Sequence, residues 1–249
     1  MKPFIVCGVD VELCGNNNVL SVGIATYNLS TRQHSTELFT MPDTILPTDE
    51  RGRTVLKRDG SLCTNTIEDY GSFSRQKWEG FWREHPKHLA AQIQWQPTLH
   101  TNKDVWQQIR MYIDTLTLEA ARRGYRVRLT SDNLGVDVGI INEHFKRYIT
   151  KRFDGDEVTL DHQLLIEGEE RRHVVVVCAA FPQWQVRKHI IPPFDIPFVS
   201  VYLHKHRADH DALQSALMYS GYIKAYPQTE SLKHHFKDPK RRVPPETFV

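Results

Sequence analysis

Two carboxylates stand two residues apart near the end of the first predicted strand. The segment FIVCGVDVEL (residues 4–13) is short and rich in Ile and Val, as buried strands are, and it carries Asp10 and Glu12. Because strand side chains alternate between the two faces of a sheet, both acids point to one face, about 6–7 Å apart. Like charges this close need a compensating cation, which a divalent metal ion bound by oxygen ligands supplies. The pair is therefore a candidate half of a metal site, although plain solvated strand ends carry the same pattern.

Two later segments bring further acids close to predicted helix starts. SDNLGVDVGIIN places Asn133 at a strand end and Asp137 four residues later, near the start of a helix, where the helix dipole alone would favour an acid. HRADHDALQSA places His206 and Asp211 five residues apart, with Asp211 in the first turn of the last helix. Asp209 is the better candidate for the N-cap of that helix, but capping does not explain His206.

The elements that must position these side chains follow from hydrophobic periodicity and turn residues. The cleanest amphipathic helix begins at Asn102 as N-cap, carries an apolar stripe of Val105, Ile109 and Ile113, and stops at Gly124. The predicted strands are 4–12, 19–27, 34–41, 125–133 and 172–180, and the predicted helices are 74–94, 102–123, 136–149 and 210–226. This order predicts an α/β fold with a mixed sheet that helices cover.

The segment between the third strand and the long helix resembles an insertion. Residues 42–64 are rich in Pro, Asp, Arg and Gly and predict an exposed loop. The helix that follows is expected to break near Pro86. Trp78, Phe81 and Trp82 share one helical face, so they are predicted to form core rather than a stacking platform for bases.

The motifs together resemble those of the DEDDh family of 3′→5′ exonucleases. The matching residues are Asp10-Val11-Glu12, the pair Asn133 and Asp137, and the run from His206 to Ala212, in the family's order and spanning residues 10–212. The resemblance implies an RNase H-like fold, a mixed β-sheet flanked by helices with a helical insertion. We expect one exonuclease domain over residues 1–232, an insertion at about 40–100 and a basic, Pro-rich tail at 233–249.

The resemblance also implies roles for the matching residues. Asp10, Glu12, Asp137 and Asp211 would be the ligands of two Mg²⁺ or Mn²⁺ ions, with Asp10 bridging them. His206 would be the general base that accepts a proton from the attacking water, as the near-neutral pKa of imidazole allows. The expected activity is removal of nucleoside 5′-monophosphates from the 3′ end of DNA or RNA.

This chain departs from the family pattern beside two of the motifs. Leu13 and Cys14 stand where a polar pair usually follows the first motif, and Val136 replaces an aromatic residue before the second acid. In the family, the departing positions usually touch the terminal nucleotide or pack beneath the site, so the departures affect substrate preference. Leu13, Cys14 and Asn133 are the expected substrate contacts.

Composition restricts the partners and the setting. The 249 residues carry 32 Lys and Arg against 30 Asp and Glu, a net charge of +2, which neither announces nor excludes a nucleic-acid partner. The expected partner is a single-stranded nucleic acid with a free 3′ end, and the basic runs 146–153 and 233–242 could contact phosphates. The four cysteines form no CxxC pair, and no signal peptide or membrane span is evident, so we expect a soluble, intracellular protein.

Two rival interpretations remain open from the sequence. His204, His206 and His210 could ligate zinc, although no cysteine partner or HExxH pattern accompanies them. Alternatively, the chain could be a catalytically silent nucleic-acid-binding domain of the same fold. The complete set of acids argues against that second rival.

Overall fold

The computed structural model describes most of the chain. The described residues are 4–15, 17–93, 101–148, 151–153, 156–158, 170–171, 174–178, 185–189, 192–200, 203 and 205–227. The predicted tail at 233–249 lies outside them.

A mixed sheet forms the centre of the molecule. Its strands, in spatial order, are β3 (His34–Thr40), β2 (Val19–Asn28), β1 (Phe4–Leu13), β4 (Arg126–Ser131), β8 (Val174–Cys178) and β7 (Glu170–Arg171). β1 runs antiparallel to β2 and parallel to β4, which is in turn parallel to β8. Two further strands, β5 (Lys151–Phe153) and β6 (Asp156–Val158), pair only with each other among the described strands. The predicted α/β class is confirmed.

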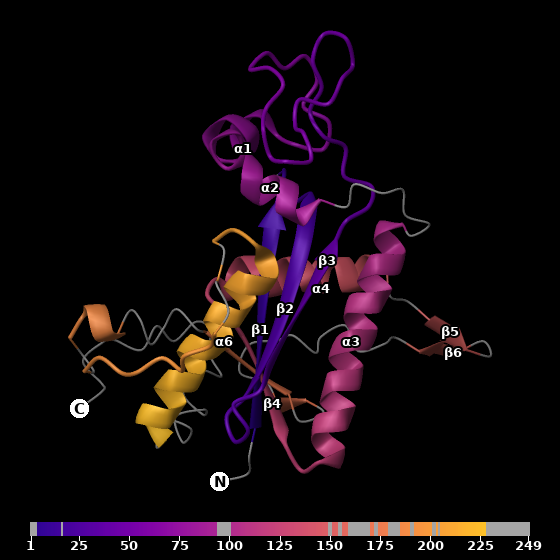
Figure 1. Cartoon of the computed structure of the whole chain (residues 1–249). Coiled ribbons are helices and arrows are strands. Elements are labelled where there is room, and N and C mark those ends of the chain that lie inside the picture. Colours follow the sequence, from indigo (N-terminus) through magenta and orange to yellow (C-terminus); the bar gives the residue numbers. More distant parts are fainter. Residues whose placement is uncertain are drawn as a thin grey trace.

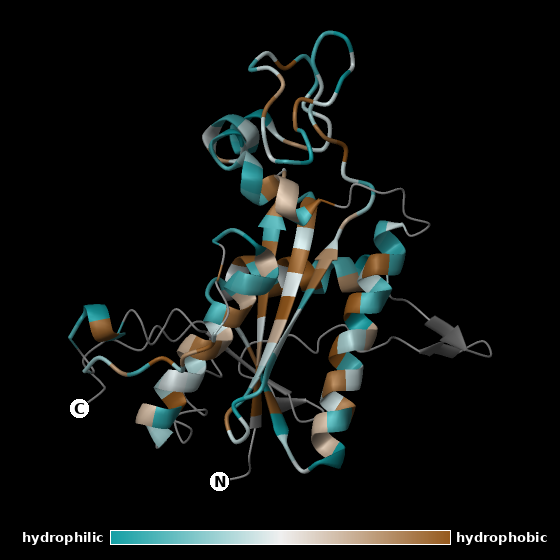
Figure 2. Cartoon of the chain, in the orientation of Figure 1, coloured by the Kyte–Doolittle hydropathy of each residue, from teal (hydrophilic) through white to brown (hydrophobic). Residues whose placement is uncertain are grey.

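Helices cover both faces of this sheet (Figure 1). α3 (Asn102–Arg122) and α4 (Leu134–Tyr148) pack against one face, where Val9 and Val11 of β1 meet Ile109 and Ile141. α6 (Ala208–Ala225) packs against the other face, on β1 and β2. The stripe predicted for α3 is buried as expected, and Figure 2 shows hydrophobic bands along β1 and β2.

Glycines let α6 approach the sheet closely. On the α6 face, Gly8 of β1 is followed by Asp10 and Glu12, and the register pairs Asp10 with Gly23 of β2. A Cβ on Gly8 would lie 1.8 Å from the carbonyl oxygen of Ala212, and one on Gly23 would lie 1.9 Å from the carbonyl carbon of Ala208. The backbone of α6 therefore touches the sheet directly, which brings the start of the helix beside the two acids.

Residues 41–93 form a separate layer beyond the carboxyl end of β1, which we call the cover segment (Figure 1). It holds α1 (Arg75–Gly80), the 3₁₀ turn η1 (Trp82–Glu84) and α2 (Pro86–Gln92). Trp78 and Trp82 are buried in its hydrophobic core together with Cys14 and Leu20 of the sheet end. The indole N–H of Trp82 also donates to the carbonyl of Leu13, at 2.9 Å. The cover segment is thus packed firmly onto the end of β1.

The predicted break near Pro86 is confirmed: η1 ends at Glu84 and Pro86 begins α2, because proline lacks only an N–H that the first helical turn leaves unbonded. A further interruption at Phe81, between α1 and η1, was not predicted. The N-cap of α3 is Thr101, not Asn102. The Thr101 hydroxyl accepts from the N–H of Asp104, whose carboxylate accepts in return from the N–H of Thr101.

The described helices include none that is long and apolar enough to cross a membrane.

We predict that Gly23→Ala destabilises the protein by about 1–3 kcal/mol, because the added methyl group collides with the backbone at the start of α6. Chemical denaturation measures the change. Gly139→Ala in α4 is the matched control: no described atom lies within 4 Å of its Cβ, and helical alanine is about 0.5–1 kcal/mol better than glycine. Equal effects from the two substitutions would contradict the close packing of α6.

Candidate metal centre

Acids from three distant segments meet at the carboxyl end of β1. Asp10 and Glu12 come from β1, Asp137 from the first turn of α4 and Asp211 from the first turn of α6. A fifth acid, Asp132, lies between β4 and α4. Parallel β1 and β4 end at the same edge, and α6 crosses the sheet beside that edge, so the fold itself assembles the cluster.

Among the described residues, potential ligand atoms gather into two groups of three. In one, an oxygen from each of Asp10, Asp132 and Asp137 lies within 4.8 Å of the others. In the second, Glu12 and Asp211 lie within the same distance of each other and of a ring nitrogen of His206. The structure thus brings together all five residues predicted as ligands or base, and adds Asp132.

The surroundings of Asp10 disfavour its charged form. Burial raises the pKa of its carboxyl well above the ordinary value, and the charges of Glu12, Asp137, Asp211 and Asp132 raise it further. Its Oδ2 is buried and has no hydrogen-bond partner among the described residues. A buried carboxylate oxygen without a donor is costly unless a cation binds it, and this atom fits that role.

The pKa of Glu12 is raised to about 7, first by burial and then by the charge of Asp211. Lys77, on α1 of the cover segment, acts in the opposite direction. The effect of Lys77 is too small to cancel those of burial and Asp211, so the pKa of Glu12 stays above its ordinary value.

Asp137 is held in place by its neighbours. Burial raises the pKa of its carboxyl to about 6, while hydrogen bonds from the Ser131 hydroxyl and from the N–H groups of Val11 and Asn133 act against that rise. The carbonyl of Asn133 accepts from the N–H of Asp137, at 2.9 Å, as the first turn of α4 forms. These bonds fix one ligand group at the junction of β4 and α4.

Asp211 and His206 are linked through the backbone. The N–H of His206 donates to Asp211 Oδ2 at 2.8 Å. Burial raises the pKa of the Asp211 carboxyl to about 6, and this hydrogen bond opposes the rise. The φ of His206 is +59°, in the left-handed region that residues other than glycine seldom adopt.

The imidazole of His206 lies among other rings. Phe81, His85 and His88 of the cover segment have ring centroids 4.7, 5.1 and 5.9 Å from that of His206. Burial lowers the pKa of His206, and the nearby charges of His85, His88 and Lys205 lower it further. Neutral imidazole, the form that can accept a proton, is therefore favoured at and above neutral pH.

The donors around the cluster are carboxylate oxygens with one imidazole. Hard, oxygen-preferring ions such as Mg²⁺ and Mn²⁺ suit the carboxylates, and the imidazole lies beside them. Each of the two groups offers carboxylate oxygens that could hold a divalent ion.

No protein-family model matches the sequence, and no curated protein shows significant similarity to it. The function has to be argued from the site itself.

The three predicted substrate contacts differ in how far they are exposed to solvent. Asn133 is exposed beside the cluster, and Leu13 is partly buried against the main core. Cys14 is fully buried in the core of the cover segment, where its thiol donates to the carbonyl of Asn18. The Cys14 side chain is therefore not accessible to a nucleotide in this structure, because the cover segment packs over it.

The histidine cluster considered for zinc does not converge in the part that is described. His210 is buried with Nε2 3.8 Å from Asp209, and Asp209 in turn accepts from Arg207 at 2.8 Å. Asp209 is thus a buried ion-pair partner and not the N-cap of α6, which is Arg207. His204 lies outside the described residues.

Sequence reasoning missed Asp132 and the cover-segment residues that surround His206. Asp132 directly precedes Asn133, so its place at a strand end next to a recognised motif was the available signal. His85, His88 and Phe81 carry no such signal, because their approach to His206 depends on tertiary packing.

The raised carboxyl pKa values predict a specific pH dependence for the metal-free protein. A folded-state pKa above the unfolded one stabilises the fold at low pH, and this contribution is lost as the pH rises from about 4 through 6–7. In EDTA, Asp10→Asn should therefore become more stable than the wild type as pH rises from 4.5 to 8. Adding Mn²⁺ at pH 8 should stabilise the wild type more than this variant.

Thermal unfolding at several pH values measures this difference. Glu37→Gln, on the exposed side of β3, is the control and should track the wild type throughout. A constant gap between Asp10→Asn and the wild type would show that the pKa of Asp10 is not raised in the folded protein.

Asp132→Asn should weaken Mn²⁺ binding about tenfold or more, since Asp132 shares a group with Asp10 and Asp137. Isothermal titration calorimetry gives the affinity. Glu119→Gln, an exposed change on α3, should leave it unaltered. Unchanged affinity in Asp132→Asn would remove this residue from the site.

Proposed function

We propose that the protein is a metal-dependent 3′→5′ exonuclease with an RNase H-like fold, similar to the DEDDh family. It would hydrolyse phosphodiester bonds of DNA or RNA and release nucleoside 5′-monophosphates. The 3′→5′ direction and the single-stranded substrate rest on the resemblance of the motifs.

One observation carries the proposal: five carboxylates from three distant segments meet beside one imidazole that favours its neutral form. A structural role explains this poorly, because the buried acids repel one another and Asp10 Oδ2 has no donor among the described residues. Such strongly perturbed groups cluster at functional sites.

The residues can be given roles in hydrolysis. Two divalent ions, when bound, would activate the attacking water and stabilise charge on the leaving 3′-oxygen. Glu12 and Asp211 would hold one ion, Asp132 and Asp137 the other, and Asp10, which is affected by the charges of both groups, would bridge them.

His206 would take the proton of the attacking water. As the water oxygen bonds to phosphorus, the bond from phosphorus to the 3′-oxygen of the preceding nucleotide breaks. That oxygen takes up a proton from solvent to become the new 3′-hydroxyl, and the terminal nucleoside 5′-monophosphate leaves. A base with near-neutral pKa is suited to this transfer, and proximity to Glu12 and Asp211 places it beside the group that would hold the attacking water.

The direct test uses single-stranded DNA and RNA, each labelled at the 5′ or the 3′ end, with Mn²⁺ or Mg²⁺. Stepwise shortening of the 5′-labelled strand, with immediate release of a labelled mononucleotide from the 3′-labelled strand, is the expected result. Intact substrate in every lane, with retained binding in a gel shift, would instead support the silent nucleic-acid-binding domain.

His206→Ala should reduce kcat by about 10²–10⁴-fold, the usual contribution of a general base. Mn²⁺ affinity should survive in this variant, because the five acids remain. Asp10→Asn should lose both activity and metal binding. His34→Ala, on β3 away from the site, controls for loss of a histidine. Near-normal turnover in His206→Ala would transfer the role to another group.

A further inference from the structure

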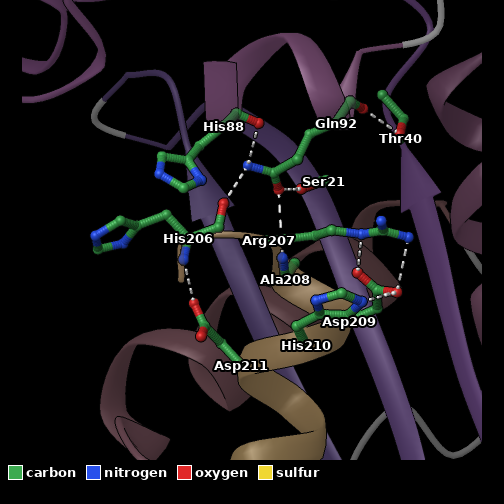
Figure 3. A network of polar contacts seen from close by, with 10 residues as sticks. All are labelled: Ser21, Thr40, His88, Gln92, His206, Arg207, Ala208, Asp209, His210 and Asp211. Atoms are coloured by element: carbon green, nitrogen blue, oxygen red, sulfur yellow. Dashed lines mark hydrogen bonds and ion pairs between the residues drawn. The ribbon is translucent and has the colours of Figure 1, made fainter. Parts of the chain in front are cut away.

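Gln92, the last residue of α2 in the cover segment, is buried against the start of α6. It is 1% exposed, and its side chain reaches from the cover segment toward the turn that carries His206 (Figure 3). It belongs to none of the motifs that the sequence revealed.

Every hydrogen-bonding position of the Gln92 amide is used. Oε1 accepts from the hydroxyl of Ser21 at 2.6 Å and from the N–H of Ala208 at 3.4 Å. Nε2 donates to the carbonyl of His206 and, at 3.5 Å, to that of His88 (Figure 3). One buried amide therefore joins β2, α2, the His206 turn and the first residue of α6.

Two different side chains bind the backbone of His206, one at its carbonyl and the other at its N–H. Gln92 binds the carbonyl, and Asp211 binds the N–H at 2.8 Å. Since the φ of His206 is +59°, this conformation persists only where surrounding groups fix it. Asp211 is also a candidate metal ligand, whereas Gln92 is not, so the Gln92 contact to this turn does not depend on a metal ion.

Ser21 sets the orientation of the amide. It pairs with Glu12 across β1 and β2, so the two side chains share the α6 face of the sheet. Its hydroxyl donates to Oε1, which turns Nε2 toward the carbonyl of His206. The Gln92 backbone is fixed as well, because its carbonyl accepts from the hydroxyl of Thr40.

We propose that Gln92 is a positioning residue that holds the His206 turn in its catalytic conformation and makes the cover segment part of the active site. Gln92 touches neither substrate nor metal ion in this role; it acts through His206. The role of His206 rests on the proposed nuclease function, whereas the effect of Gln92 on the turn does not.

The experiment compares Gln92→Met, which keeps the side-chain length and removes all four hydrogen bonds, with the wild type. Hydrogen exchange of the full chain in EDTA should become about tenfold or more faster at residues 206–208, as expected when a local opening is made easier. With Mn²⁺ and single-stranded DNA or RNA, kcat should fall about tenfold or more, because a misplaced base loses its alignment. KM and Mn²⁺ affinity should change by less than about threefold, since the acids are not altered.

Two further variants keep the test decisive. Ser220→Ala removes a buried hydrogen bond from the distal half of α6 and should leave exchange at 206–208 and kcat as in the wild type. Ser21→Ala removes one of the two hydrogen bonds to Oε1 and leaves Gln92 in place. It should give smaller changes in the same direction as Gln92→Met. If Gln92→Met does not fold, hydrogen exchange and kcat of Ser21→Ala test the proposal instead.

Wild-type exchange at 206–208 in a folded Gln92→Met, or in Ser21→Ala where the first does not fold, would overturn the proposal. Faster exchange with unchanged kcat would also overturn it, because the turn would then not matter for the reaction. Faster exchange in a protein whose wild type cleaves no substrate would reject the nuclease function and the catalytic role, while the link between Gln92 and the turn would stand.

Discussion

Repulsion among carboxylates at the carboxyl end of β1 is the constraint on which the other features depend. Asp10, Glu12, Asp137 and Asp211 all have raised pKa values, and burial is the largest cause for each. A fold that only needed stability would place apolar or neutral side chains there. Protonation or a bound cation would relieve this cost, and the second possibility makes the cluster a candidate metal site.

The close approach of α6 to the sheet also positions one acid of the candidate metal centre. Gly8 and Gly23 bring the α6 backbone into contact with the sheet, so Asp211 in the first helical turn meets Glu12 at the strand end. Larger residues at the two glycines would move the helix and its acid away from β1. The apolar pairs farther along the same face, such as Val6 with Tyr27, then fill the space where α6 diverges from the site.

Sequence reasoning reached the parts of the fold and site that local signals encode. The strand character of residues 4–13 and the stripe of α3 predicted their elements correctly, and the order of elements predicted the α/β class. The acids followed from their spacing on a strand and at helix starts. The sequence could not show which segments the cover segment touches, because Phe81, His85 and His88 reach His206 only through tertiary contacts. The burial of Cys14 beneath the cover segment depends on tertiary contacts of the same kind.

The cover segment supports the residues of the site as well as covering them. Its core includes Cys14 and Leu20 from the sheet, and the Trp82 indole binds the carbonyl of Leu13 just beyond Glu12. At its other end, Gln92 binds the turn that carries His206. The segment therefore supports the site at the end of β1 and at the start of α6. Because both supports are hydrogen bonds donated by buried side chains, loosening the cover segment would disturb the acids and the imidazole together, which a separately attached lid would not do.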